Sequence, residues 1–200
     1  MIKRIKVSQY RCFQALDIEL TPLMVLAGAN GSGKSTLLEL PTLFGELLAS
    51  NDINDVFFEV TPSQNEARAS TPIELLHQLQ GHTFSLSLEV QIPKPIQYEL
   101  SHSLDITVPS VNFQPAIIRY TLAFELINHE QFQIAQEHLL LLLKPEQSPY
   151  QIIQRDKGKQ TSTFQAEGQS QTFQFTISPK QLALSSLPAD HRFFFSHAFV

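Results

Sequence analysis

Gly28-Ala29-Asn30-Gly31-Ser32-Gly33-Lys34-Ser35 follows the pattern G-x-x-x-x-G-K-[ST], in which each residue type has a physical task. The loop holds three of the chain's seven glycines, and glycine lets a backbone take positive φ and approach a phosphate without a Cβ in the way. Consecutive N–H groups then form an anion nest at the positive end of a helix. We predict a phosphate-binding loop in which Lys34 lies between the β- and γ-phosphates and the Ser35 hydroxyl binds Mg²⁺.

The residues on either side of this loop predict its setting. Leu23 to Ala27 is continuously apolar, which is typical of a strand buried on both faces in a parallel sheet. Lys34 to Leu40 predicts a helix that begins where the loop ends. Pro41 lacks a backbone N–H and clashes one turn back, so we expect it, together with Gly45, to interrupt that helix early, with a kink or a restart.

The first twenty residues predict an antiparallel pair of strands. Ile5 and Val7 alternate with basic residues, and residues 16–20 alternate between apolar and acidic ones. A period of two indicates half-exposed strands, here joined around Tyr10 to Gln14. The acidic side chains of the second strand are expected to face the basic side chains of the first.

Downstream of the helix the pattern becomes strand-like. Thr71-Pro72-Ile73-Glu74 predicts a capping box that opens a short helix through about Leu79. From about Thr83 onward the apolar pattern predicts strands and one hairpin that turns at Asp156-Lys157-Gly158. The candidates are Phe84 to Ile92, Ile96 to Val108, Ile117 to Ile127, Gln131 to Leu143, Tyr150 to Arg155, Gln160 to Gln165, and the alternation of Phe173, Phe175 and Ile177.

The composition excludes several classes of protein. Hydrophobic residues make up 42% and charged residues 16%, which predicts a globular chain. The net charge of −5 excludes a general basic footprint for nucleic acid, although Lys3, Arg4, Lys6 and Arg11 leave open a local patch or ordinary strand charges. The single cysteine, Cys12, excludes a disulfide framework. No apolar run approaches the ~20 residues of a membrane helix, so we predict a cytoplasmic protein without a membrane partner.

The second half of a hydrolytic site is missing from the sequence. ATP hydrolysis by this class requires an apolar strand that ends in a carboxylate for Mg²⁺, but Leu139 to Leu143 is followed by Lys144-Pro145. Leu184-Ser185-Ser186 resembles a fragment of an ABC signature, yet Leu187-Pro188 stands where a glycine is required. The seven histidines show no ligand spacing and predict surface or core positions. We therefore expect an incomplete domain.

Residues 2–47 resemble the start of RecF/SMC-like ABC-class ATPases, and more closely the small bacterial OLD-like and RecF-like AAA proteins. The resemblance consists of a strand, the step Tyr10-Arg11-Cys12-Phe13, a second strand and the loop. It implies ATP and Mg²⁺ as ligands, with Ser35 on the metal. It also implies that Thr36 contacts the α-phosphate and that Arg11 reaches the phosphates; a plain helix residue and a surface arginine on a turn are the alternatives. The implied binding residues are Arg11, Gly28, Asn30, Gly31, Ser32, Gly33, Lys34, Ser35 and Thr36.

The resemblance further implies an α/β P-loop NTPase half-domain with a large antiparallel β lobe. On this basis residues 1–50 hold the first strands, the loop and the first helix of the ATPase core, and residues 51–82 a connecting segment. Residues 83–180 form the β lobe, and residues 181–200 begin a helical segment. Relatives bind ATP between two subunits, so a homodimer is implied, with an effector protein or DNA as a further partner. A Q-loop glutamine is not identifiable; Gln64, Gln78 and Gln80 are weak candidates.

Three hypotheses follow from the sequence. The first is an ATP-binding domain of the RecF/OLD-like class whose hydrolysis requires elements absent from this chain. The second is a non-catalytic interaction module with a vestigial loop. The third is the N-terminal part of an OLD-type ATPase-nuclease.

Overall fold

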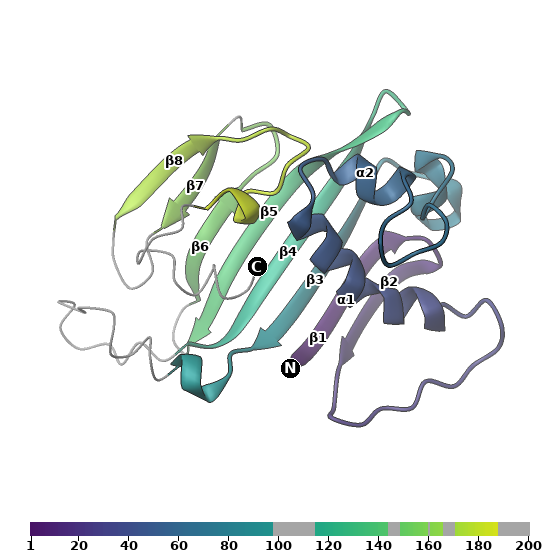
Figure 1. The fold of residues 1–200 in the computed structure, drawn as a ribbon, viewed down its shortest axis with the longest axis horizontal. Coiled ribbons are helices and arrows are strands. Elements are labelled where there is room, and N and C mark those ends of the chain that lie inside the picture. Colours follow the sequence, from purple (N-terminus) through teal and green to yellow (C-terminus); the bar gives the residue numbers. More distant parts are fainter. Residues whose placement is uncertain (98–114, 144–148, 160, 166–170, 188–200) are drawn as a thin grey trace.

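An antiparallel sheet of eight strands, in the order β2-β1-β3-β4-β5-β6-β7-β8, runs through the molecule (Figure 1). The structure is a computed structural model that describes residues 1–97, 115–143, 149–159, 161–165 and 171–187. The strands are β1 (Ile2–Tyr10), β2 (Phe13–Glu19), β3 (Thr83–Gln91), β4 (Pro115–Ile127), β5 (Gln131–Leu143), β6 (Tyr150–Arg155), β7 (Thr161–Gln165) and β8 (Thr172–Thr176). The helices are α1 (Lys34–Ala49) and α2 (Ile53–Phe58), and three 3₁₀ helices are η1 (Pro72–Leu75), η2 (His77–Leu79) and η3 (Leu184–Ser186).

The predicted N-terminal hairpin is confirmed. β1 pairs antiparallel with β2, and Lys6 lies opposite Asp17 in the register. Asp17 forms ion pairs with Arg4 at 2.6 Å and with Lys6 at 3.1 Å. The hydrogen bond from Arg4 lowers the pKa of Asp17 to about 2. Both basic side chains thus act as cross-strand partners, as the alternating pattern predicted.

The predicted β-rich region forms most of the sheet. Five of its expected strands appear as β3, β4, β5, β6 and β7, and β8 lies where Phe173 and Phe175 alternate with polar residues. The expected strand at Ile96 to Val108 falls almost wholly outside the described residues, and the backbone at 94–97 is helical. β1 pairs directly with β3. The segments predicted as ATPase core and as β lobe therefore share one sheet, whereas the domain boundaries themselves stay a prediction.

The helices lie on one face of this sheet and close the core over it (Figure 1). α1 contributes an apolar stripe that includes Leu40, Leu43 and Leu47, all of them buried. From α2, Phe57 enters a cluster of rings with Phe84, Phe124 and Phe132 at centroid distances of 5.5 to 5.9 Å. Such ring pairs add to the free energy already gained by burying their area. α1 and α2 are thereby fixed on the sheet.

Of the two outcomes predicted at Pro41, the restart is wrong, because α1 continues as one helix through Pro41 and Gly45 to Ala49; the kink stays a prediction. Pro41 removes one backbone hydrogen bond, but leucines on both sides of it remain buried against the sheet, and tertiary packing supplies most of a helix's stability. Within the described residues, no helix combines the length and apolar character that crossing a membrane would need.

The predicted helix after Thr71 is shorter than expected and has 3₁₀ rather than α geometry. Pro72 occupies the first helical position, as predicted, and Glu74 accepts a hydrogen bond from the Ser70 N–H at 3.0 Å. The Thr71 hydroxyl donates to Glu74 at 2.8 Å and does not cap the helix. The capping box is therefore formed only in part, which fits a helix that ends after one turn.

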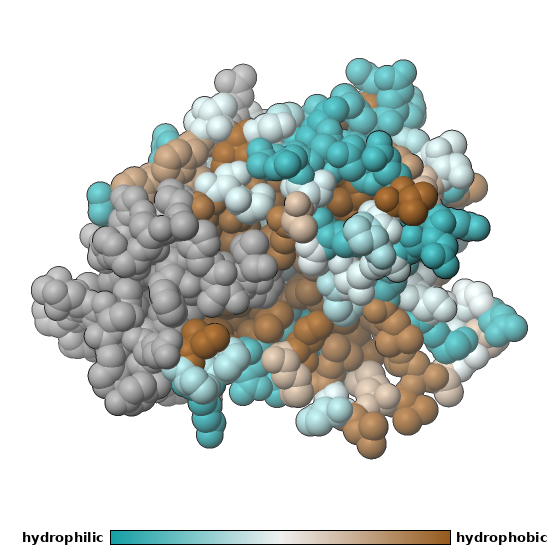
Figure 2. Space-filling view, viewed as in Figure 1, coloured by the Kyte–Doolittle hydropathy of each residue, from teal (hydrophilic) through white to brown (hydrophobic). Residues whose placement is uncertain are grey.

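The predicted buried strand at Leu23 to Ala27 is also wrong. These residues have no regular secondary structure, and Leu23 and Val25 are 87% and 84% exposed. A strand requires hydrogen-bonded neighbours, and within the described residues every strand pairing is antiparallel and none includes this segment. Figure 2 shows hydrophobic side chains at the surface over this connection between β2 and α1.

Candidate functional site

The loop from Gly28 to Ser35 leads directly into α1 and leaves the start of that helix open. Gly31 and Gly33 have φ of 79° and 90°, which favours glycine. Gly33 is the N-cap residue of α1, no side chain caps the helix, and its first turn holds no acidic residue. The free N–H groups and the positive end of the helix dipole are therefore available to an anion. The motif predicted positive φ at Gly31 and Gly33 correctly, whereas Gly28 does not have a positive φ.

The turn between β1 and β2 packs against the base of the loop. A Cβ added to Gly33 would lie 2.7 Å from the Cys12 Sγ and 2.7 Å from the Phe13 Cζ. At Gly31 a Cβ would meet nothing within 4 Å. Gly33 is thus required for close packing as well as for its backbone conformation, and the aromatic step before β2 sets the position of the loop.

Lys34, the first residue of α1, directs its ammonium back across the loop. Its Nζ donates to the carbonyl oxygens of Gly28 at 2.9 Å and Ala29 at 2.7 Å, and lies 3.4 Å from the Ser32 Oγ. These acceptors are neutral, and a phosphate oxygen is a stronger acceptor for an ammonium because both groups are charged. Lys34 is therefore in reach of a ligand held by the loop N–H groups.

A cavity of about 290 Å³ lies beside the loop and gathers most of the residues predicted from the sequence. It is lined by Arg11, Cys12, Asn30, Gly31, Gly33, Lys34, Ser35 and Thr36. Gly28 and Ser32 are not on its wall, and a Cβ at Gly28 would be 2.8 Å from the Ser32 Oγ. The cationic, donor-rich wall fits a polyphosphate, and Ser35 offers one hydroxyl to a metal ion that accompanies it.

Arg11 has left-handed backbone geometry (φ 48°) in the β1–β2 turn, and its guanidinium bonds to protein groups. The Nη1 lies 3.2 Å from the Glu39 Oε2, and the Nη2 donates to the carbonyl of Arg68. The backbone of the turn is held as well, because the Arg11 N–H donates to the Leu75 carbonyl at 2.9 Å. Arg11 thus lines the cavity while it contacts α1 and the loop that precedes η1.

Sequence reasoning missed the ionic cluster behind this arginine. The Arg68 side chain is 0% exposed, and it bonds to Glu39 at 2.6 Å and to Glu46. Burial acts to raise the pKa of Glu46, but hydrogen bonds from Ser63, Thr61 and Arg68 outweigh it and hold that pKa below its usual value. The seven-residue spacing of Glu39 and Glu46 on one helix face was a signal for the glutamates. Nothing local distinguished Arg68.

The remaining sequence candidates are dispersed. Gln64 donates to the Glu39 Oε1 at 2.7 Å, whereas Gln78 lies inside η2 with φ of 54°. Leu139 to Leu143 belongs to the antiparallel strand β5, and Lys144-Pro145 lies outside the described residues. In the part of the chain that the structure describes, no three His, Cys, Asp or Glu side chains are grouped as a metal site. Among the described residues, the cavity beside the loop is therefore where most of the predicted binding residues come together.

The sequence is similar to that of known proteins. The sequence model of a family described as "AAA ATPase domain" matches residues 1–186. An OLD nuclease of Thermus scotoductus (strain ATCC 700910 / SA-01) is 45% identical over 38 residues, which is 19% of this chain. That match spans 7% of the nuclease's length.

A solved structure from work on "ATP-driven dimerization and DNA stimulated activation of SMC ATPases" aligns at 13% identity with a TM-score of 0.33. The alignment covers 64% of this chain and 70% of the other. A TM-score of this size does not establish a shared fold.

Proposed function

The chain belongs to the AAA ATPase domain family, as the match over residues 1–186 shows, and from that premise we propose that it binds Mg²⁺-ATP at the loop from Gly28 to Thr36. The observation that carries the proposal is the uncapped start of α1, reached through two glycines at positive φ and followed at once by Lys34. Backbone N–H groups there hold the phosphates, and the helix dipole favours their charge.

Four side chains on the cavity wall have a part in this binding. Lys34 exchanges its bonds to the Gly28 and Ala29 carbonyls for the β- and γ-phosphate oxygens. Ser35 supplies one hydroxyl to the Mg²⁺ that arrives with the nucleotide. Thr36 and Arg11, which line the same cavity, contact the α-phosphate and the terminal phosphates respectively.

Hydrolysis requires groups that we place in a partner or in sequence beyond these residues. Fixed positive groups lower the barrier to phosphoryl transfer, but a second carboxylate and a residue that orients water are also needed. We propose that two copies bind ATP between them, and that an effector protein or DNA responds to this assembly. For the 200-residue chain alone, we expect binding that is weak or dependent on a partner, and turnover that is slow or absent.

Isothermal titration of Mg²⁺-ATP into a concentrated solution of the chain, in which two copies can associate and weak binding gives heat, tests the proposal. Lys34→Ala should weaken binding by about tenfold to a hundredfold, because a hydrogen bond to a charged group contributes about 1.5–3 kcal/mol. Lys157→Ala is the matched control: its ammonium is 61% exposed and pairs with Glu125 away from the loop, so the affinity should not change. Absence of heat with the unaltered chain would instead favour the interaction module with a vestigial loop.

A steady-state ATPase assay with the same two variants separates binding from turnover. Robust turnover that depends on Lys34 would show that a complete hydrolytic site is present in this chain, and it would refute the assignment of the missing groups to a partner or to further sequence.

A further inference from the structure

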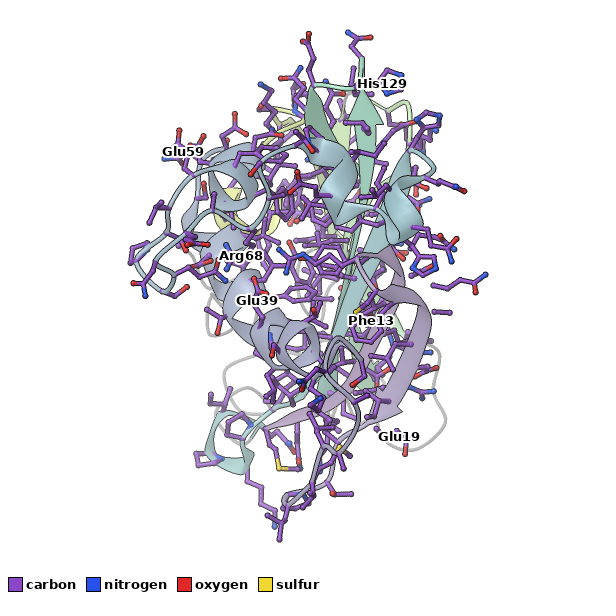
Figure 3. The ribbon with its side chains drawn as sticks, turned by 90° about the vertical axis from the view of Figure 1, so that its right-hand side faces the viewer. Phe13, Glu19, Glu39, Glu59, Arg68 and His129 are labelled. Carbon is purple, nitrogen blue, oxygen red and sulfur yellow. The ribbon has the colours of Figure 1, made fainter. Side chains whose placement is uncertain are left out.

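A buried arginine ties α1 to the segment around α2. The Arg68 Nε lies 2.6 Å from the Glu39 Oε1, the Nη1 donates to the Val56 carbonyl at 2.7 Å, and the Nη2 bonds to Glu46. A guanidinium stays charged in proteins, so its burial requires these carboxylates. Figure 3 shows Glu39 and Arg68 side by side beneath the loop that carries Arg68.

The two carboxylate oxygens of Glu39 bind three partners. Its Oε1 accepts from Arg68 at 2.6 Å and from the Gln64 Nε2 at 2.7 Å, whereas its Oε2 faces the Arg11 Nη1 at 3.2 Å. If Arg11 moves away, Glu39 keeps a cationic partner and two hydrogen bonds. The Arg11–Glu39 pair can therefore open without leaving a buried charge alone, which is the costly outcome for an ion pair.

Arg11 also lines the cavity beside the phosphate-binding loop, together with Gly33 and Lys34. Carboxylates and phosphates both bind the planar guanidinium fork, and both can do so with two oxygens at once. The 3.2 Å contact to Glu39 involves a single nitrogen. The same side chain is thus placed between a carboxylate of the protein and the position of a ligand phosphate.

We propose that Glu39 is a positioning residue that competes with bound triphosphate for Arg11. It holds the guanidinium at the edge of the cavity and releases it when phosphate oxygens arrive, while Arg68 and Gln64 keep Glu39 in place. The proposal depends on the nucleotide binding proposed above. As a consequence, the observed free energy of Mg²⁺-ATP binding is smaller by the free energy of the Arg11–Glu39 pair. The same reduction holds for any protein whose binding-competent state is only partly populated.

A double-mutant cycle measured by titration calorimetry on the full chain tests this. Glu39→Gln keeps the shape of the side chain and an acceptor for Arg68 but removes the charge that attracts Arg11. It should tighten Mg²⁺-ATP binding by about threefold to tenfold, the size expected for a partly exposed ion pair. In an Arg11→Ala background, Glu39→Gln should change the affinity by less than about twofold.

Glu46→Gln is the matched control, because Glu46 bonds to Arg68 as Glu39 does, whereas its hydrogen bonds within the described residues join it to Ser63 and Arg68 and not to Arg11. It should change the affinity by less than about twofold. If Glu39→Gln loses its cooperative unfolding transition, Glu39→Met repeats the test, since it fills similar space and leaves Arg68 paired with Glu46.

The outcomes distinguish this inference from the proposed function. Lys34-dependent binding that is unchanged or weakened by Glu39→Gln would overturn the role of Glu39 and leave ATP binding intact. Equal tightening with and without Arg11 would also overturn it, because the effect would then be direct repulsion between carboxylate and phosphate. No binding by the unaltered chain would refute both.

Discussion

Replacing the buried Glu137 by glutamine should destabilise the protein, and the structure allows the size of the effect to be worked out. The Glu137 Oε1 accepts from the Tyr120 hydroxyl at 2.7 Å and from the Leu184 N–H at 2.9 Å, and the Oε2 accepts from the Ala183 N–H at 2.7 Å. Burial raises the pKa of this carboxyl, and the bonds from Ala183, Tyr120 and Leu184 oppose the rise. Glu137 therefore attaches the segment that contains η3 to the sheet.

Glutamine cannot satisfy these donors in either orientation of its amide. If the NH₂ replaces Oε2, the Ala183 N–H loses its acceptor, and if it replaces Oε1, the Leu184 N–H does. A buried donor without a partner costs about 1–3 kcal/mol. Arg155, 3.8 Å from the Oε2, also loses its counter-charge, although it keeps the Ser178 and Gln181 carbonyls at 2.9 Å. We expect a total loss of about 3 kcal/mol, at the low end for breaking a buried ion pair.

Urea unfolding followed by circular dichroism measures this loss. Glu125→Gln is the control, because Glu125 pairs with the exposed Lys157 and such a pair contributes about 0–1 kcal/mol. A loss below about 1 kcal/mol for Glu137→Gln, or one equal to that of the control, would refute the reasoning. The carboxylate would then not be needed to hold the η3 segment.

Two further pairs of substitutions test the loop and the connection that leads to it. Gly33→Ala should weaken Mg²⁺-ATP binding and reduce stability more than Gly31→Ala does. Both positions have positive φ, but only a Cβ at Gly33 collides with Cys12 and Phe13. Equal urea midpoints for the two variants would contradict this. Val25→Ser should change the free energy of unfolding by less than about 0.5 kcal/mol, since Val25 is exposed. Val7→Ser, at a buried position of β1, should instead lower the free energy of unfolding by about 2 kcal/mol or more. A loss above about 1 kcal/mol at Val25 would show that this segment is a buried strand after all.

The elements that the sequence predicted well are those whose cause is local. Alternation along β1 and β2 indicated the hairpin and the pairing of Lys6 with Asp17, because a strand places successive side chains on opposite faces whatever lies beyond it. The loop motif indicated positive φ at Gly31 and Gly33, because only glycine takes such angles readily. The membership in an ATPase family, which the resemblance of the first 47 residues implied, is confirmed by the match over residues 1–186.

Predictions that depended on distant neighbours were wrong or were not made. Leu23 to Ala27 has the composition of a buried strand, but composition does not supply the neighbouring strands that would bury it. Pro41 is unfavourable for a helix by local rules, yet the contacts of α1 with the sheet outweigh that preference.

From the sequence alone follow the positive φ of Gly31 and Gly33, the helix after the loop and the strands of the β-rich region, because each is encoded in consecutive residues or a short period. The tertiary structure alone decides the surroundings of Arg11. Its partners Glu39 and the Arg68 carbonyl are 28 and 57 residues away in the chain. No local pattern specifies such a contact, since it exists only when the sheet and both helices have packed together.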